Sequence, residues 1–148
     1  MTNTGQPWSW SAILLALSGV TLIGAGLYFL LLRSPLLPED LRFIGWEPAH
    51  ADAVRPGLEA WLTHVFRVLG GYVLATGVLT VTLAATSFRQ YQPGAGLGAL
   101  IGGAASIGVM AATNFIIDSD FKWALLGIAV LWAVSLVAFV FERSRSSP

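Results

Sequence analysis

The amino-acid sequence predicts an all-α fold, an integral membrane four-helix bundle of up-down topology with a short interfacial helix between spans one and two. Hydrophobic residues make up 55% of the chain and charged residues only 11%, against about 25% charged residues in a soluble protein. The mean hydropathy of +0.72 agrees with that balance. Four apolar runs are each long enough to cross a hydrocarbon core of about 30 Å, which takes roughly 20 residues.

The 148 residues form one predicted domain, 1–148. The four spans are expected at about 10–32, 58–88, 95–117 and 121–141, with an extramembrane segment at 34–57. No Lys or Arg precedes the first apolar run, whereas a secretory signal begins with a basic region. We therefore expect the first run to be a retained span. The polar turn at 89–93 is too short for anything but an antiparallel hairpin between spans two and three.

The segment between spans one and two is acidic and contains the stretch PEDLRFIGW. Pro38 suits the first turn of a helix and Gly45 suits its end, so this stretch predicts a short helix. Its acidic residues follow Pro38, at the positive end of the helix dipole. The apolar side chains of this helix are expected at the membrane interface, where they are candidates for contact with a partner: Leu41, Phe43, Ile44 and Trp46.

Small residues recur along spans two and three and predict close helix packing. The residues expected at such contacts are Gly94, Gly98, Gly102 and Ser106 in span three, and Gly70, Gly71 and Ala75 in span two. A second stripe of small residues, Ala95, Ala99 and Gly103, lies beside the first. The stripe in span three fits either packing within the bundle or a homodimer contact, and we favour packing within the bundle.

Two ionisable residues, His64 and Arg67, stand three apart on one helical face just before the uncharged run of span two. The predicted hairpin brings this face to the same side of the membrane as Asn114 and Asp118 at the end of span three. One interpretation is structural, because Arg67 can reach water or close a salt bridge with Asp118. The other is a binding site for a quinone or lipid headgroup formed by all four residues, because ionisable groups at a span edge are functional candidates.

Several other functions are disfavoured by the composition. The chain has no cysteine and its formal net charge is zero, so thiol chemistry and a basic nucleic-acid surface are not expected. His50 with Asp52 on the loop is a weak metal signal, because a zinc site needs further ligands, and we expect no metal. The run Gly94 to Ala99 matches a dinucleotide fingerprint but lacks the preceding strand. No catalytic residue set is found, so the chain is more consistent with a non-enzymatic protein.

The stretch HVFRVLGGYVLATGVLTV in span two, with Arg67 followed by Gly70 and Gly71, resembles the second span of small bacterial four-helix membrane proteins of the DoxX-like type. The resemblance covers all four spans. It implies a quinone-linked or accessory role in respiratory complexes, as some members of these families have. Relatives that relay electrons through cysteines differ from this chain, which has none.

The function expected from these features is that of a non-enzymatic subunit, or an accessory or scaffolding factor, of a larger bacterial membrane complex. The alternative is a quinone- or lipid-headgroup-binding protein linked to respiratory redox chemistry, and a third interpretation is a small homo-oligomeric transporter. The expected partners are the lipid bilayer and other membrane subunits or further copies of the chain, and a quinone or lipid is the candidate cofactor. A count of basic residues does not favour the usual orientation, since the other side has Arg33, Arg42, Arg55 and Lys122. We nevertheless expect the termini on the cytoplasmic side of a bacterial cytoplasmic membrane, because Arg89, Arg143 and Arg145 lie close to the membrane on their side while acids dominate the other side.

Overall fold

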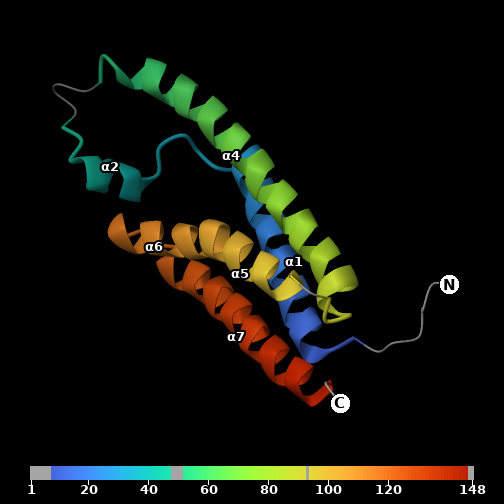
Figure 1. Ribbon diagram of the computed structural model, residues 1–148. Helices are drawn as coiled ribbons and strands as arrows, with labels where there is room; N and C mark the ends of the chain where they lie inside the picture. The colour runs from blue at the N-terminus through green and yellow to red at the C-terminus, as the bar shows by residue number, and fades with distance from the viewer. Residues whose placement is uncertain (1–7, 48–51, 93, 147–148) are drawn as a thin grey trace.

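The computed structural model describes residues 8–47, 52–92 and 94–146, and these residues form helices and connecting turns without any strand (Figure 1). In chain order the elements are α1 (Trp10–Leu31), α2 (Pro38–Ile44), α4 (Arg55–Leu83), the π-helical turn η1 (Ala84–Phe88), α5 (Ala95–Gly103), the π-helical turn η2 (Ala104–Gly108), α6 (Val109–Ile116) and α7 (Lys122–Ser146). The all-helical prediction is therefore confirmed.

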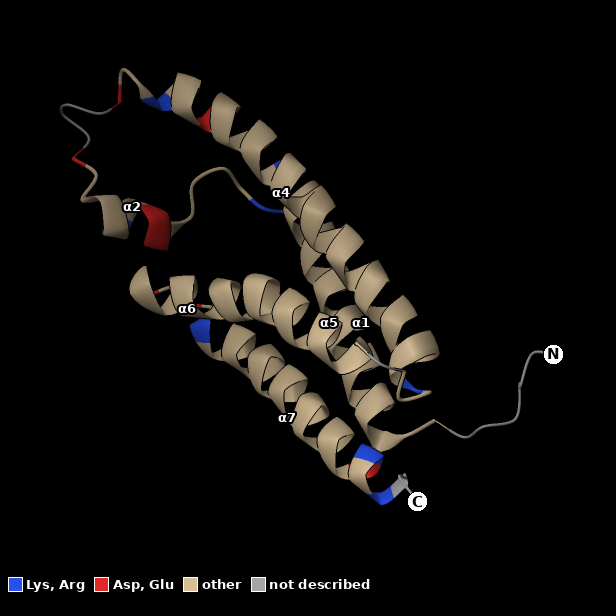
Figure 2. Ribbon diagram, in the orientation of Figure 1, with Lys and Arg blue, Asp and Glu red and all other residues tan. Residues whose placement is uncertain are grey.

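Four continuous helical segments are long and apolar enough to cross a membrane: Trp10–Leu31, Arg55–Phe88, Ala95–Ile116 and Lys122–Arg145. They coincide with the four predicted runs, although the last helix continues past the expected end near Phe141. Charged positions gather mainly at the ends of the long helices and on α2 (Figure 2). Such a distribution keeps the middle of each long helix apolar.

Local sequence signals explain where α1 and α2 begin and end. Ser9 caps α1, because its Oγ accepts a hydrogen bond from the backbone N–H of Ala12 at 3.3 Å. Pro38 is the first residue of α2, as predicted, and Asp40 accepts a hydrogen bond from the backbone N–H of Leu37. Gly45 ends α2 in the left-handed conformation with φ of 62°, which glycine adopts without steric cost.

The closest helix contact joins α1 to the middle of α4. A Cβ atom on Gly26 would lie 2.5 Å from the backbone nitrogen of Leu74, and one on Gly70 would lie 2.8 Å from that of Leu30. Gly19 of α1 and Gly77 of α4 make the same kind of backbone contact about two helical turns away. Gly70 thus packs against another helix as predicted. The prediction is wrong for Gly71, which faces open space, and for Ala75, which is exposed, because both point away from α1.

Span three packs through a different stripe from the predicted one. Gly98 and Gly102 are exposed and face open space, Ser106 bonds to the carbonyl of Gly102 in its own helix, and Gly94 forms the turn before α5 with φ of 85°. The neighbouring stripe of Ala95, Ala99 and Gly103 is buried instead. Its contact with α7 decides the rotation of the helix: the indole N–H of Trp132 donates to the carbonyl of Ala99, and this indole fills the space beside Gly103.

The apolar core lies where η1, the start of α1 and the end of α7 meet. Phe88 and Phe139 stack with ring centroids 4.2 Å apart, and Ala12, Leu15 and Ala84 pack around them. Glu142 joins the same end of the bundle through polar contacts. Its carboxylate accepts hydrogen bonds from the backbone N–H of Trp10, from Ser11 and from the hydroxyl of Tyr91. The beginning of α1 is therefore attached to the end of α7.

The α1–α4 contact can be tested with two adjacent glycines. We expect Gly70→Ala to lower the free energy of unfolding by about 1–3 kcal/mol, because the new methyl group meets backbone atoms of α1. Gly71→Ala is the control and should be neutral or slightly stabilising, since its methyl group meets open space and alanine favours a helix. Reversible unfolding in mixed detergent micelles measures both, and equal losses at the two positions would contradict this packing.

Candidate functional site

The predicted cluster of His64, Arg67, Asn114 and Asp118 does not assemble. His64 and Arg67 are exposed on α4 and make no hydrogen bond or ion pair in the described part of the chain. Asp118 pairs with Lys122 one turn further on, and that ammonium group lowers the pKa of the Asp118 carboxyl through a hydrogen bond and its positive charge. The amide of Asn114 donates to the carbonyl of Met110 at 2.9 Å.

The expected Arg67–Asp118 contact is therefore wrong, and the helix arrangement gives the reason. The hairpin turn joins α4 to α5 at one end of the bundle. Away from that turn, α4 packs against α1, whereas α6 packs against α7. The first half of α4 diverges from α6 (Figure 1). A hairpin connection between two helices therefore does not bring their far ends into contact.

A cavity of about 350 Å³ lies at this end of the bundle, between α1, α2, α6 and the beginning of α7. Apolar and aromatic side chains form most of its wall, and the polar groups are few. The lining residues are Gly24, Ala25, Tyr28, Phe29, Arg33, Leu37, Glu39, Asp40, Met110, Asn114, Ile117, Ser119, Phe121, Ala124 and Leu125. Of the predicted site residues, Asn114 contributes to this cavity.

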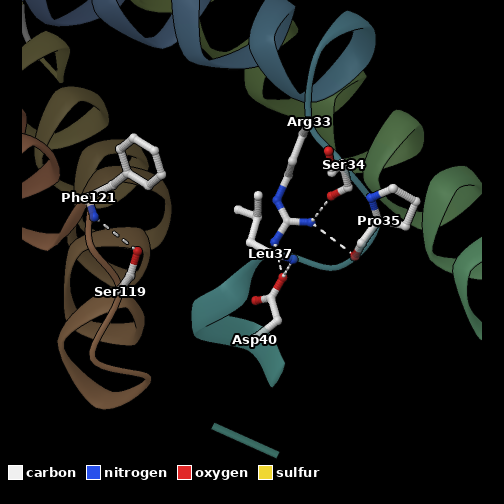
Figure 3. Close-up of polar contacts among 7 residues, drawn as sticks. All are labelled: Arg33, Ser34, Pro35, Leu37, Asp40, Ser119 and Phe121. Atoms are coloured by element: carbon white, nitrogen blue, oxygen red, sulfur yellow. Dashed lines mark hydrogen bonds and ion pairs between the residues drawn. The ribbon is translucent and has the colours of Figure 1, made fainter. Parts of the chain in front are cut away.

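Arg33 and Asp40 form an ion pair in the wall of the cavity. The Nη2 atom of Arg33 lies 3.0 Å from Oδ2 of Asp40, and the two side chains are 8% and 21% exposed. Nη1 of Arg33 donates to the carbonyl oxygens of Ser34 and Pro35 (Figure 3). The guanidinium carbon also lies 3.5 Å from the ring centroid of Phe66 on α4. Arg33 thus joins the end of α1 to α2 and α4.

Glu39, next to Asp40, is the buried residue of α2 at 3% exposure. Its side chain has no hydrogen bond and no ion pair within the described residues. The fully buried side-chain atoms without a partner in those residues are Trp46 Nε1 and Arg89 Nε. The carboxylate oxygens of Glu39 therefore retain some accessible surface, and the cavity that Glu39 lines provides that space.

The turn between α6 and α7 forms the opposite wall. Ser119 is 2% exposed, and its Oγ accepts a hydrogen bond from the backbone N–H of Phe121 at 3.2 Å. Figure 3 shows Ser119 and Phe121 across from Arg33, Leu37 and Asp40. The ring of Phe121 also lies near that of Tyr28, with centroids 6.4 Å apart. This wall therefore adds aromatic surface and one hydroxyl group to the cavity.

A second basic residue, Arg42, connects α2 to the opposite wall. Its Nη2 donates to the carbonyl of Asp118 at 3.0 Å and lies 3.3 Å from Oδ1 of Asp120. Together with the Arg33–Asp40 pair, this contact holds α2 over the cavity from both sides. Phe43 and Ile44 of α2 are exposed and Leu41 and Trp46 are partly buried, so the apolar residues proposed for partner contact remain available in part.

A second cavity of about 390 Å³ lies between α1, α4 and span three. Phe29, Met110 and Asn114 line both cavities, so the two adjoin. Tyr72 and Val109, which also line the second cavity, are exposed on the outside of the bundle. The two cavities thus lie next to each other and share part of their walls, and the second reaches the outer surface between α4 and α6.

This arrangement has the features of a small-molecule binding site. Among the described residues no group of three His, Asp or Glu side chains could hold a metal ion, and His50 of the proposed loop cluster lies outside them. An apolar cavity with a few convergent polar groups is typical of a small-molecule site. Sequence reasoning missed its ionisable residues because Arg33 directly follows the predicted first span, and because the acids after Pro38, Glu39 and Asp40, were explained by the helix dipole alone. The sequence signal that could have identified them is that the arginine and the two acids stand on either side of a proline-containing turn, which can bring them together.

The site and fold define an all-helical protein with four helices apolar enough to cross a membrane and a polar-ended cavity under a short helix. Comparisons with protein families, with curated proteins and with solved structures find no match. The resemblance to DoxX-like proteins therefore stays a prediction.

The two arginines provide a direct comparison of the observed and predicted sites. Arg33→Leu should lower the free energy of unfolding by about 2 kcal/mol or more, because it leaves Asp40 without its ion-pair partner in a largely buried position. Arg67→Leu should have little effect, since Arg67 is exposed and unpaired in the described chain. Unfolding in detergent micelles measures both. A larger loss for Arg67→Leu would restore the originally predicted cluster.

Proposed function

We propose that this chain is an integral membrane protein that binds an amphiphile, a lipid or an isoprenoid quinone, in the cavity under α2. The observation that carries the proposal is the combination of one polar end, formed by Arg33, Glu39 and Asp40, with an adjoining apolar cavity that reaches the outside of the bundle. An amphiphile has the same two-part character. Its polar end would lie under α2, and its chain would follow the second cavity towards the lipid.

The membrane arrangement in this proposal is a four-span bundle in up-down order. The four helices have sufficient length and hydropathy, and Glu142 attaches the beginning of α1 to the end of α7, so both lie at one end. Arg89, Arg143 and Arg145 occur at that end next to the long helices, and the segment 34–57 at the other end is acidic, which together support a cytoplasmic location of the termini in a bacterial inner membrane. The exposed Phe43 and Ile44 would place α2 at the opposite interface.

Binding of this kind requires no reaction at the site, so we propose a carrier, sensor or accessory role rather than an enzyme. A second candidate is a subunit of a larger membrane complex, in line with the resemblance to DoxX-like proteins. One observation favours it: Gly98 and Gly102 line a groove of about 190 Å³ between α4 and α5 without packing against any described helix. Glycine on a lipid-facing surface gains nothing, whereas it lets a partner helix approach closely.

Cavity filling tests the amphiphile proposal. Gly24 lines the cavity and Gly127 on α7 does not, and a side chain added at either position begins in open space. We expect protein purified in mild detergent to carry a lipid or quinone, detected by native mass spectrometry. Gly24→Phe should lose it, because the ring occupies the cavity, and Gly127→Phe should keep it. Retention in both variants would disprove binding at this cavity, and the same spectra show whether other subunits or further copies are attached.

The topology can be tested by thiol labelling, since the chain has no cysteine of its own. Single variants are made at four exposed positions, Asp52→Cys, Asp120→Cys, Gln90→Cys and Ser144→Cys. In intact cells an impermeant maleimide should label the first two and leave the last two unmodified until the membrane is opened. The reverse result would invert the orientation, and any other partition would exclude the four-span arrangement.

A further inference from the structure

Glu39 is a buried acid for which the described chain provides no partner. Glutamate is almost never fully buried unless it is paired, because an ionised carboxylate away from water is strongly disfavoured. Yet this residue is 3% exposed, lacks a hydrogen bond and an ion pair in the described chain, and lines the cavity under α2. Its carboxylate is therefore placed where a ligand, rather than the protein, can supply the partner.

The basic side chains around the cavity are already engaged. Arg33 donates to Asp40 and to two backbone carbonyl groups. Arg42 contacts the carbonyl and carboxylate oxygens of the turn between α6 and α7, and Lys122 pairs with Asp118 in that turn. None of the three forms a hydrogen bond or ion pair with Glu39 in the described chain, and reorganising them would break these bonds.

The charge of the cavity follows from its ionisable lining residues. These are one guanidinium group, that of Arg33, and two carboxyl groups, those of Glu39 and Asp40, so the formal charge of the lining is −1. The Arg33–Asp40 pair is neutral as a unit, so the uncompensated charge belongs to Glu39. An anionic headgroup entering here would meet that carboxylate without a free basic residue to receive it.

We propose that Glu39 selects the ligand by charge, and that the polar end of the amphiphile is an ammonium group. This inference rests on the proposed function, since it specifies the chemistry of the molecule in the same cavity. An ammonium group would donate a charge-assisted hydrogen bond to the carboxylate, and such bonds are about twice as strong as neutral ones. The rings of Tyr28, Phe29 and Phe121 line the same cavity and also attract a cation through their faces.

The experiment compares three probes that share one alkyl chain: dodecylamine, dodecanol and dodecanoate. Each is titrated into the full-length protein in a neutral maltoside detergent, and binding is followed by native mass spectrometry. The wild type should bind dodecylamine at least about ten times more tightly than dodecanol, the gain expected for a hydrogen bond to a charged group. Dodecanoate should bind more weakly than dodecanol, because Glu39 repels it.

Glu39→Gln removes the charge and keeps the shape of the side chain. It should abolish the preference for dodecylamine over dodecanol, whereas the control Glu59→Gln, at an acid paired with Arg55 outside the cavity, should retain it. A preference that survives in Glu39→Gln would overturn the inference, as would equal binding of the three probes to the wild type. Either result leaves amphiphile binding intact. If none of the probes binds to the wild type, the proposed function itself fails.

Two further measurements complete the test. Without ligand, Glu39→Gln should unfold at the same temperature as the wild type or higher, because it removes an unpaired buried carboxylate. A large loss of stability would show that the carboxylate serves the fold and would overturn the inference.

Phosphatidylethanolamine is then added as a competitor of dodecylamine. Displacement would identify a membrane lipid as the source of the ammonium group, and dodecylamine binding that resists it would identify a free amine-bearing amphiphile, both in support of the inference.

Discussion

The backbone contact between α1 and α4 is the constraint on which the cavity depends. Because Gly26 and Gly70 carry no side chain, the two helices approach until a single methyl group would collide with the opposite backbone. This approach brings the end of α1 to Phe66 of α4, and the guanidinium group of Arg33 lies over that ring. Arg33 in turn holds Asp40 and, with it, the beginning of α2. A looser contact would leave the charged end of the cavity without a fixed wall.

The sequence contained enough information for the long helices and α2, and for most of their limits. Hydropathy identified the four long helices, because a run of about 20 apolar residues is typical of a helix long enough to span a membrane. Pro38 and Gly45 identified the ends of α2 through their backbone preferences, and the structure has the helix between them. These signals are local: each depends on a residue and its immediate neighbours. Local signals are the ones that a single sequence expresses directly.

The rotation and the neighbours of each helix could not be predicted in this way. In a soluble helix the polar face marks the outside, but nearly every face of these helices is apolar, so Gly98 and Ala99 offered equally plausible contact stripes. The choice was made by Trp132, which bonds to the carbonyl of Ala99 from a helix distant in sequence. The cluster around Arg67 does not form because the first half of α4 diverges from α6 (Figure 1), and Asp118 pairs with Lys122 four residues along the chain. Pairings between helices are set by the whole packing arrangement.

The position of α2 reverses the usual arrangement of an amphipathic helix on a soluble protein. Its acids, Glu39 and Asp40, lie towards the bundle and the cavity, while Phe43 and Ile44 are exposed. That orientation would be unfavourable in water but suits a helix at a membrane interface, where the outer side meets lipid and the inner side covers a polar pocket. It also places Glu39 and Asp40 on a short helix outside the four long apolar helices. A charged ligand end could therefore reach Glu39 without crossing the apolar middle of the bundle.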